Sequence, residues 1–336
     1  MIRYVASRLL GAAVMAVLAT LVVFLIANTV PGDPVLAQLG DIAASNPETV
    51  REWRAKWGLD LPLWERYGLF LRGLLNGDLG TSIASQRPVL EDILQYAPAT
   101  IELATIAFIL ALAAGIPLGI AAAVWRDSWV DAAARMVSLI GVSSPTFWLA
   151  FVMLALFYGG LQIAPGPGRL DPIAFPPPDV TGLFLVDSIL AGDWEAFHDA
   201  AAHLVLPSIV LAAATIGLIT RTTRAAMLEA MGQDYVRVSR SKGLPERFIV
   251  LRHILPNALI PVVTLGGLAF ANLLAGAVMT ETVFSWPGLG RYTFRSAAAL
   301  DFPAIMGITL VVSVSTLLVN LLVDLSYALL DPRVRR

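Results

Sequence analysis

The chain contains no cysteine, only three histidines and only two lysines, Lys56 and Lys242. Without cysteine, neither a disulfide framework nor a thiolate metal site is available, and the histidines are scattered along the sequence. No GxxxxGK(S/T) run is present, so the chain has no phosphate-binding loop with which to bind ATP. HExxH and GxSxG are also absent, and we expect this chain to hold no catalytic site, no metal and no cofactor.

Charge is scarce as well. Charged residues make up 14% of the chain and hydrophobic residues 57%, whereas roughly a quarter of a soluble domain is charged. The net charge of −2 provides no basic surface for a nucleic acid. The composition therefore predicts an integral membrane protein surrounded by the lipid bilayer.

Long apolar runs are the dominant feature that is present. A helix needs about 20 apolar residues to cross about 30 Å of hydrocarbon. Because the runs are continuous and lack period-two alternation, they predict helices and exclude a barrel, so the fold class is all-α. We count the first run as a retained span, since it exceeds the apolar core of a signal peptide, about 7–15 residues. The six predicted transmembrane helices are Leu9 to Val30, Ala99 to Trp125, Met136 to Tyr158, Leu204 to Thr220, Leu259 to Val283, and Ala304 to Leu330.

The distribution of arginine and lysine in the short loops predicts the orientation. If the N-terminus is cytoplasmic, most basic residues lie on the cytoplasmic side, in agreement with the positive-inside rule. Six of the basic residues left on the other side lie in one long segment, and long segments cross largely regardless of charge. We therefore expect both termini in the cytoplasm.

The chain divides into two predicted parts. Residues 1–97 form a transmembrane helix and an extracytoplasmic segment, and residues 98–336 form a five-helix core with a cytoplasmic loop at about 224–256. Aromatic residues from Trp53 to Phe70 recur at helix-like spacing in the outer segment, where they either form a small core or rest on the bilayer surface. A second outer segment, Gly159 to His203, is rich in proline and glycine and predicts an irregular loop.

A charged segment, Arg221 to Pro256, separates the fourth and fifth apolar runs. Gly232 is expected to end the fourth helix, and Asp234 to cap a short helix from Tyr235 to Lys242. Gly243 then suits a left-handed C-terminal cap, and Pro245 suits the first turn of another helix. The spacing places four side chains on one face of the short helix: Tyr235, Val238, Ser239 and Lys242.

Eight residues are too few for a stable isolated helix, so this one needs a partner. The following helix is expected to be amphipathic and to break at Pro256, with Phe248, Leu251, Ile254 and Leu255 on its apolar face. Physical arguments alone leave two interpretations: the short helix is presented to another protein, or it lies on the inner membrane surface.

The residues of this segment resemble a loop found in ABC importers. Gly243 followed by Leu255-Pro256 is similar to the EAA loop of their membrane subunits, although Arg237, Val238 and Ser239 stand at the EAA triplet and His253 at a position usually held by isoleucine. Asp234 to Arg237 and Arg240 to Leu244 resemble the variant of the dipeptide, oligopeptide and nickel permease branch. Matching motifs occur in order along the chain: Pro31-Gly32-Asp33-Pro34, Gly77-Asp78-Leu79-Gly80, Glu281-Thr282, Phe284 to Gly290, Asp324 to Tyr327, and Asp331-Pro332-Arg333.

The resemblance implies a type I ABC importer (MetI-like) permease fold in a bacterial plasma membrane. It implies a partner permease, usually a different homologous chain, two cytoplasmic ATPases that bind ATP and Mg²⁺, and an extracytoplasmic solute-binding protein. ATP-driven closure of the ATPases would move the short helices and open the path outward. The residues implied to contact an ATPase are Tyr235, Val236, Arg237, Val238, Ser239, Arg240, Lys242, Gly243, Leu244 and Pro245.

Polar residues inside the apolar runs are candidates for the translocation path, because burying them in lipid is costly. Ser143-Ser144-Pro145 is the first candidate, and the alternative is a kink that only serves packing. Glu102 and Glu281 either face cargo or, as we favour, lie at the outer interface with solvated charges. Asp324 is expected near the inner end of the last span, where it could meet Arg221 or Arg224 as part of a gate.

Four functions were weighed. The leading hypothesis is an importer permease for short peptides, and the second is the same machinery importing nickel or another small solute. An ATP-independent secondary transporter or scaffold would need inverted repeats or ion-coupling acids, and neither is evident. A membrane enzyme lacks any arrangement of nucleophile and base.

Overall fold

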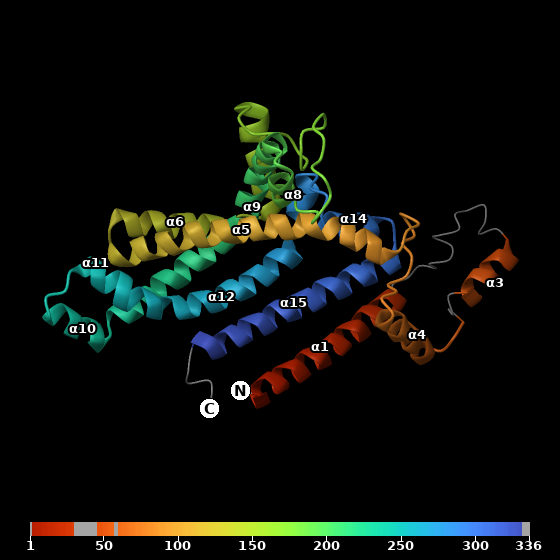
Figure 1. The fold of residues 1–336 in the computed structure, drawn as a ribbon, viewed down its shortest axis with the longest axis horizontal. Coiled ribbons are helices and arrows are strands. Elements are labelled where there is room, and N and C mark those ends of the chain that lie inside the picture. The colour runs from red at the N-terminus through yellow and green to blue at the C-terminus, as the bar shows by residue number, and fades with distance from the viewer. Residues whose placement is uncertain (1, 30–45, 57–59, 331–336) are drawn as a thin grey trace.

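The computed structural model describes residues 2–29, 46–56 and 60–330 (Figure 1). Every regular element in these ranges is a helix, which confirms the all-α class, and two short π-helices carry the label η. In chain order the helices are α1 (Ile2–Thr29), α3 (Pro47–Lys56), α4 (Leu63–Leu75), α5 (Val89–Val124), α6 (Trp129–Ser143), α7 (Thr146–Met153), η1 (Leu154–Gly160), α8 (Phe184–Ala191), α9 (Trp194–Met231), α10 (Asp234–Ser241), α11 (Glu246–Phe248), η2 (Ile249–Ile254), α12 (Leu255–Gly276), α13 (Val278–Val283), α14 (Leu289–Ala298) and α15 (Phe302–Leu330).

All six apolar runs form helices, but the predicted count of six spans is not exact. Four helices among the described residues are long and apolar enough to cross a membrane: α5, α9, the run Glu246–Val283 and α15. α1 contributes a shorter apolar helix, Leu9–Leu25. The third predicted span is not straight, because α6 and the α7–η1 helix meet at 107°. Pro145 lacks an N–H and forces Ser144 into an extended conformation, which ends α6.

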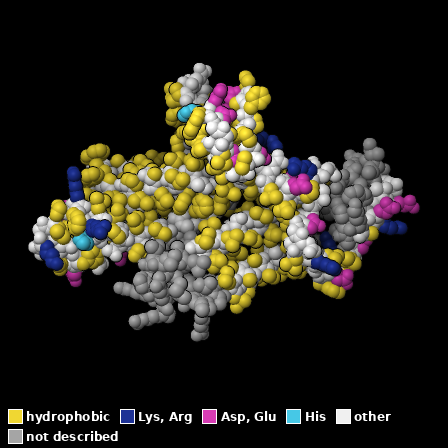
Figure 2. All heavy atoms as spheres, in the orientation of Figure 1, with side chains coloured by type: hydrophobic (Ala, Val, Ile, Leu, Met, Phe, Trp, Pro, Cys, Tyr) yellow, Lys and Arg dark blue, Asp and Glu magenta, His cyan; other side chains and the backbone are white. Residues whose placement is uncertain are grey.

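The long helices run roughly along the long axis of the molecule (Figure 1). α10 lies at one end of this axis and α3 and α4 lie at the other, while α8 and the first part of α9 project sideways. Apolar side chains cover the middle of the bundle, and charged side chains gather at its two ends and on the projection (Figure 2). This separation is what a bilayer around the middle of the bundle requires.

α9 is the most deeply buried of the long helices. The buried share of its most apolar window is 61%, compared with 17% for α15. On one side α5 approaches so closely that a Cβ at Gly119 would lie 2.5 Å from the Cβ of Thr223. On the other side a Cβ at Gly141 of α6 would lie 2.4 Å from the carbonyl oxygen of Ala213. Glycine at these positions lets three helices pack backbone against backbone, as small residues do in membranes.

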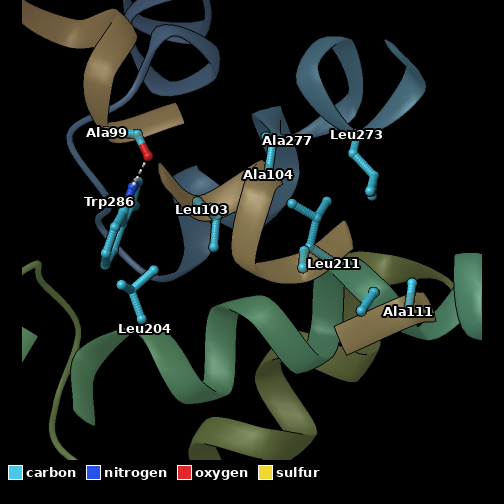
Figure 3. Packing of buried hydrophobic residues seen from close by; sticks show 11 residues of the cluster. Ala99, Leu103, Ala104, Ala111, Leu204, Leu211, Leu273, Ala277 and Trp286 are labelled. Carbon is cyan, nitrogen blue, oxygen red and sulfur yellow. Dashed lines mark hydrogen bonds between the residues drawn. The ribbon is translucent and has the colours of Figure 1, made fainter. Parts of the chain in front are cut away.

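Trp286 anchors the turn between α13 and α14 to this core. Its side chain is fully buried, and Nε1 donates a hydrogen bond of 2.9 Å to the carbonyl oxygen of Ala99 on α5 (Figure 3). The indole belongs to a buried cluster with Leu103 of α5 and Leu204 of α9. The helix α14 follows this turn and packs against the spans.

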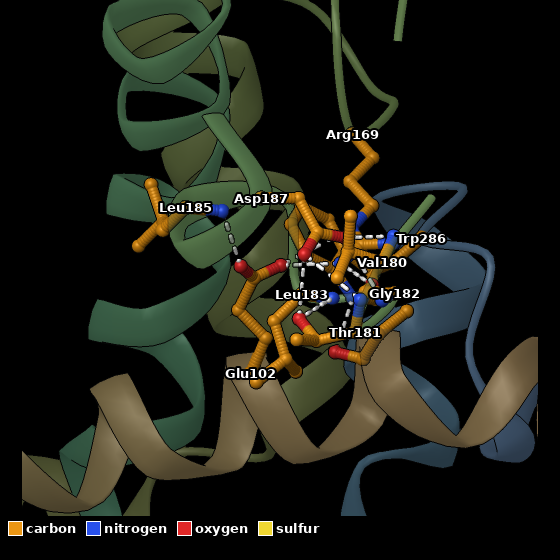
Figure 4. A network of polar contacts seen from close by, with 10 residues as sticks. Glu102, Arg169, Val180, Thr181, Gly182, Leu183, Leu185, Asp187 and Trp286 are labelled. Atoms are coloured by element: carbon orange, nitrogen blue, oxygen red, sulfur yellow. Dashed lines mark hydrogen bonds and ion pairs between the residues drawn. The ribbon is translucent and has the colours of Figure 1, made fainter. Parts of the chain in front are cut away.

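Glu102 is buried by the loop that precedes α8. Arg169 Nη2 donates to Glu102 Oε2 at 2.6 Å, and the N–H of Leu185 donates to Oε1 at 2.8 Å (Figure 4). The Arg169 guanidinium also stacks 3.6 Å over the ring of Phe184. The solvated position favoured for Glu102 is wrong, because residues 160–183 fold back and bring a buried cation to it.

Asp187 of α8 organises the same loop. Its carboxylate accepts hydrogen bonds from the hydroxyl and N–H of Thr181 and from the N–H of Gly182. Burial alone raises the pKa of Asp187, but these hydrogen bonds outweigh burial and hold the pKa below its ordinary value. The carboxylate thus stabilises the loop when ionised, and this contribution is lost as the pH falls through the lowered pKa.

Glu281 is fully buried where α13, α14 and α5 meet. It accepts a hydrogen bond of 2.6 Å from Thr100 Oγ1 and one of 2.9 Å from the N–H of Arg291, in the first turn of α14. The positive end of a helix dipole favours a carboxylate there. A Cβ at Gly288 would lie 2.4 Å from Glu281 Oε1, so only glycine leaves room for the carboxylate. The favoured solvated position is therefore wrong for Glu281 also.

The aromatic residues of the outer segment divide between the two expected roles. Tyr67 and Phe70 of α4 pack on Phe24 of α1, with ring centroids 5.3 and 5.8 Å away, and the hydroxyls of Tyr67 and Thr20 lie 2.9 Å apart. Trp64 remains 73% exposed and suits a membrane surface. The Pro31-Gly32-Asp33-Pro34 and Asp331-Pro332-Arg333 motifs lie outside the described residues.

Replacement of glycine by alanine should have opposite effects on stability at two helical positions, one inside the close contact of α5 with α9 and one outside it. Gly119→Ala should lower the stability of the folded protein by about 1–3 kcal/mol, because the new methyl group overpacks the contact with Thr223. Gly68→Ala meets nothing within 4 Å and should raise stability by about 0.5–1 kcal/mol. Thermal unfolding of the detergent-solubilised protein measures both; equal effects would contradict the packing argument.

Candidate functional site

The short helix predicted in the charged segment is present as α10, Asp234–Ser241. α9 ends at Met231 with Gly232 as its C-cap, as predicted. The N-cap of α10 is Gln233 rather than Asp234, and its side chain makes no capping hydrogen bond. Lys242 is the C-cap, and Gly243 follows with φ of +71°, which confirms the left-handed turn.

One side of α10 is buried against its own chain. Val236 is fully buried, Ser239 is 9% exposed, and Val236 belongs to a cluster that includes Met227 of α9 and Ile249 and Ile254 of η2. This cluster is the stabilising partner that so short a helix requires. Ser239 therefore does not share an outward face with Tyr235 and Val238; its hydroxyl donates 2.8 Å to the carbonyl oxygen of Tyr235.

The other side of α10 and the turn after it are exposed. Tyr235 is 39% exposed and Val238 is 53% exposed, and their i, i+3 spacing makes them neighbours on the helix surface. Around them lie basic and turn residues that also reach solvent: Arg237, Arg240, Lys242, Gly243, Leu244 and Pro245. Arg240 Nη2 and Glu246 Oε1 lie 2.6 Å apart and close the turn around Gly243. The exposed residues from Tyr235 to Pro245 thus form a mainly basic protrusion with two apolar side chains, which we call the knob.

The helix after Pro245 differs from the prediction. It begins as α11 and continues as the π-helix η2, which buries Ile249, Val250 and Ile254 and leaves Phe248 and Leu251 exposed. The expected apolar face is right for Ile254 and Leu255, which pack in the cluster, and wrong for Phe248 and Leu251, because a π turn holds more residues than an α turn and changes which side chains point inward. The expected break at Pro256 is also wrong, since this residue lies in the first turn of α12, where no N–H is needed.

The predicted Ser143-Ser144-Pro145 site lies at the bend between α6 and α7. An open hollow of about 580 Å³ is present there. Its lining combines the two serines with apolar side chains: Leu139, Ile140, Ser143, Ser144, Pro145, Phe147 and Trp148. The other two candidates do not line it, because Glu102 and Glu281 are engaged in the buried networks at the outer end.

A buried ion pair joins α6 to α9 near the arginines expected to meet Asp324, whose own contacts stay a prediction. Arg224 of α9 pairs with Asp131 of α6 through two hydrogen bonds of 2.8 and 2.9 Å. Asp131 is fully buried, and this bidentate geometry is the strong form of an ion pair. Asp324 lies in α15, but its side chain is outside the described part of the structure. Nothing in the sequence distinguished Asp131 beforehand, because it is far from Arg224 along the chain.

Two family models match nearly the whole chain. The one described as "Binding-protein-dependent transport system inner membrane component" matches residues 115–336, and its N-terminal counterpart matches residues 1–104. A solved structure of the MetNI methionine ABC transporter in inward-facing conformations is 18% identical, covers 69% of this chain and 93% of that chain, and has a TM-score of 0.48.

Curated relatives are similar over almost their full length. The "Probable D,D-dipeptide transport system permease protein DdpB" of Escherichia coli K12 is 49% identical, over 94% of this chain and 92% of the relative. The "Dipeptide transport system permease protein DppB" of Alkalihalophilus pseudofirmus is 40% identical over all of both chains, and that of Escherichia coli K12 is 42% identical over 94% of both. This chain therefore belongs to the family of binding-protein-dependent transport system inner membrane components, which are non-enzymatic permease subunits of ABC transporters.

Proposed function

We propose that this chain forms, with a second permease, the membrane path of an ATP-driven importer for short peptides. The observation that carries the coupling part of the proposal is α10, whose Val236 side is fixed to its own chain while Tyr235 and Val238 are left exposed. Relatives named for dipeptide transport support the choice of cargo. We assign the binding of ATP and Mg²⁺ to the partner ATPases and assign no cofactor to this chain.

α10 is suited to transmit force because it is fixed at both ends. It follows α9 after two residues and is joined through α11 and η2 to the run that ends at Val283. An ATPase that binds the exposed side therefore pulls on two long helices together. Val236 and Ser239 hold the helix in place, and the contact with the ATPase falls to the remaining residues from Tyr235 to Pro245.

The orientation follows from the position of α10. The start of α1 and the end of α15 lie in the half of the molecule that carries α10 (Figure 1). We place this half at the cytoplasm, with both termini, two ATPases and the basic residues of α10. The opposite end, with α3 and α4, then faces the solute-binding protein across a bacterial plasma membrane. The division into residues 1–97 and 98–336 stays a prediction.

The hollow at the α6–α7 bend is proposed as part of the cargo path. Ser143 and Ser144 provide hydroxyls at a break in the helix, where backbone groups are also free to bind a peptide. Phe147 and Trp148 are about half exposed there and supply apolar contact for cargo side chains. A second permease would close the open side of this hollow.

A substitution at Gly243 tests the coupling. Gly243→Val should abolish ATP-dependent uptake, because a β-branched residue strains the left-handed turn and adds bulk to the exposed knob. The membrane fold should still assemble, since a Cβ at Gly243 meets nothing within 4 Å. Uptake and co-purification of the ATPase are measured together.

Gly232→Val is the matched control, because Gly232 ends α9 with φ of −79° and tolerates a side chain. Normal uptake by Gly243→Val, or uptake without the ATPases, would overturn the coupling proposal.

Substitutions at the bend test the path. Ser143→Leu together with Ser144→Leu should lower peptide uptake by about tenfold or more, because two path hydroxyls are replaced by apolar groups that leave polar cargo unpaired. ATPase co-purification should not change. Thr309→Leu, on an exposed position of α15, is the control and should keep its uptake. Full uptake by the double variant would contradict the proposal that the bend is part of the cargo path.

The cargo is tested by uptake into proteoliposomes that hold the assembled importer. We expect accumulation of a radiolabelled dipeptide that requires ATP and the binding protein and is competed by unlabelled dipeptides. Nickel uptake without dipeptide uptake would instead assign the same machinery to a metal solute. This outcome changes the cargo and leaves the coupling by α10 intact, so the two parts of the proposal fail separately.

A further inference from the structure

A second hollow lies between α6 and α9, towards the end of the bundle that carries α10. It has a volume of about 360 Å³. Three of its lining side chains are arginines and most of the others are small or apolar: Ala122, Arg135, Ser138, Leu139, Val142, Thr220, Arg221, Arg224 and Ala225. Leu139 also lines the hollow at the bend and so stands between the two. Neither the coupling by α10 nor the proposed cargo path uses these arginines.

The charges in this hollow are unbalanced. Asp131 is the carboxylate that Arg224 and Arg135 share, at 2.8 and 3.4 Å. No ion pair of Arg221 is present among the described residues. Asp131 is the carboxylate in contact with guanidinium groups of the hollow; Asp127 interacts with Arg224 only at longer range and pairs with Arg126. Such an excess of positive charge in a partly apolar hollow attracts an anion.

Thr220 places a buried hydroxyl at the hollow that is free to bind a ligand. It is 2% exposed, lines the hollow, and its Oγ1 has no hydrogen-bond partner among the described residues. By contrast, the hydroxyl of Ser138, which lines the same hollow, donates 2.7 Å to the carbonyl oxygen of Gly217. An oxygen-rich ligand in the hollow would give the Thr220 hydroxyl a hydrogen-bond partner.

The position of the hollow along α9 is compatible with the headgroup region of a bilayer. α9 has 38 residues and is about 57 Å long, far longer than the roughly 30 Å of hydrocarbon in a bilayer. Arg224 and Arg221 precede its end at Met231 by about 10 and 15 Å, at 1.5 Å per residue. These arginines can therefore lie where the hydrocarbon meets the headgroups.

The surface beside the hollow is apolar. Leu139 is 60% exposed and Val142 is 48% exposed, and Met136 on the same helix is 56% exposed. An amphiphile with an anionic head and an apolar tail fits this combination of arginines and exposed apolar side chains. A second copy of this hollow would instead oppose positive charge with positive charge.

We propose that the hollow between α6 and α9 binds the phosphate headgroup of an anionic phospholipid, held by Arg135, Arg221 and Thr220 while the acyl chain lies along Val142, which does not line the cargo hollow. Basic pockets between spans on the cytoplasmic side are known to bind such lipids. This assignment is independent of the cargo and of the coupling proposed for α10.

The assembled importer in nanodiscs tests the proposal. Anionic phosphatidylglycerol in a phosphatidylcholine disc should raise the melting temperature, and native mass spectrometry should detect retained phosphatidylglycerol. Arg135→Gln and Arg221→Gln should each weaken lipid retention about fivefold and reduce the phosphatidylglycerol-dependent rise in melting temperature. Arg224 is left unchanged, because its loss would strand the buried Asp131.

Arg126→Gln is the matched control, since this exposed arginine pairs with exposed Asp127 outside the hollow. It should keep the full response to phosphatidylglycerol. Arg135→Lys keeps the charge and should restore most of the response.

Four results would overturn the proposal. The variants could respond to phosphatidylglycerol as the wild type does; inorganic phosphate could raise the melting temperature as much as the lipid does; or the variants could lose uptake of a dipeptide with a free carboxylate while keeping uptake of its amide. The third result would assign the arginines to cargo. Equal destabilisation in both lipid compositions would make the arginines structural only, and would also reject the lipid site.

Discussion

The contact of α9 with α5 and α6 is the constraint on which the remaining structure depends. In lipid the hydrophobic effect does little to bring helices together, so their association relies on close packing. Gly119 and Gly141 allow that packing on two sides of α9, where any larger residue would collide with Thr223 or with the carbonyl oxygen of Ala213. Because α9 is held this tightly, α5, α6 and α9 form one rigid unit at these contacts.

Buried polar contacts fix the neighbours of α9 at two places. Near α14, buried carboxylates join helices and loops: Glu102 binds Arg169 and Glu281 binds the first turn of α14. Nearer to α10, the Asp131–Arg224 pair joins α6 to α9. A buried charge that loses its partner is strongly destabilising, so these pairs tolerate little relative movement.

The sequence predicted the features that depend on local rules. Gly232 and Gly243 ended helices as expected, and Pro145 marked the break at the bend, although its 107° angle was not predicted. The family resemblance rested on ordered motifs and was confirmed by the comparisons. These successes share one cause: capping, proline geometry and long apolar runs are set by residues close together in the chain.

The errors share another cause, which is contact between distant residues. Glu102 and Glu281 were expected in solvent because their partners, Arg169 and Thr100, are 67 and 181 positions away. The burial of Val236 on α10 was not predicted, because it depends on contacts with residues of two other helices, Met227 of α9 and Ile249 of η2. A periodicity of 3.6 also failed for Phe248 and Leu251, which are exposed beside and within the π-helix.

That π-helix fixes the angular position of the knob. Adding one residue to an α-helical turn rotates the chain that follows it by about 100° about the helix axis. The winding of Ile249–Ile254 thus sets the direction in which α11 and the turn at Gly243 leave α12. A family member with one residue fewer in this stretch would keep a continuous helix yet point its knob elsewhere, so the length of η2 matters as much as its side chains.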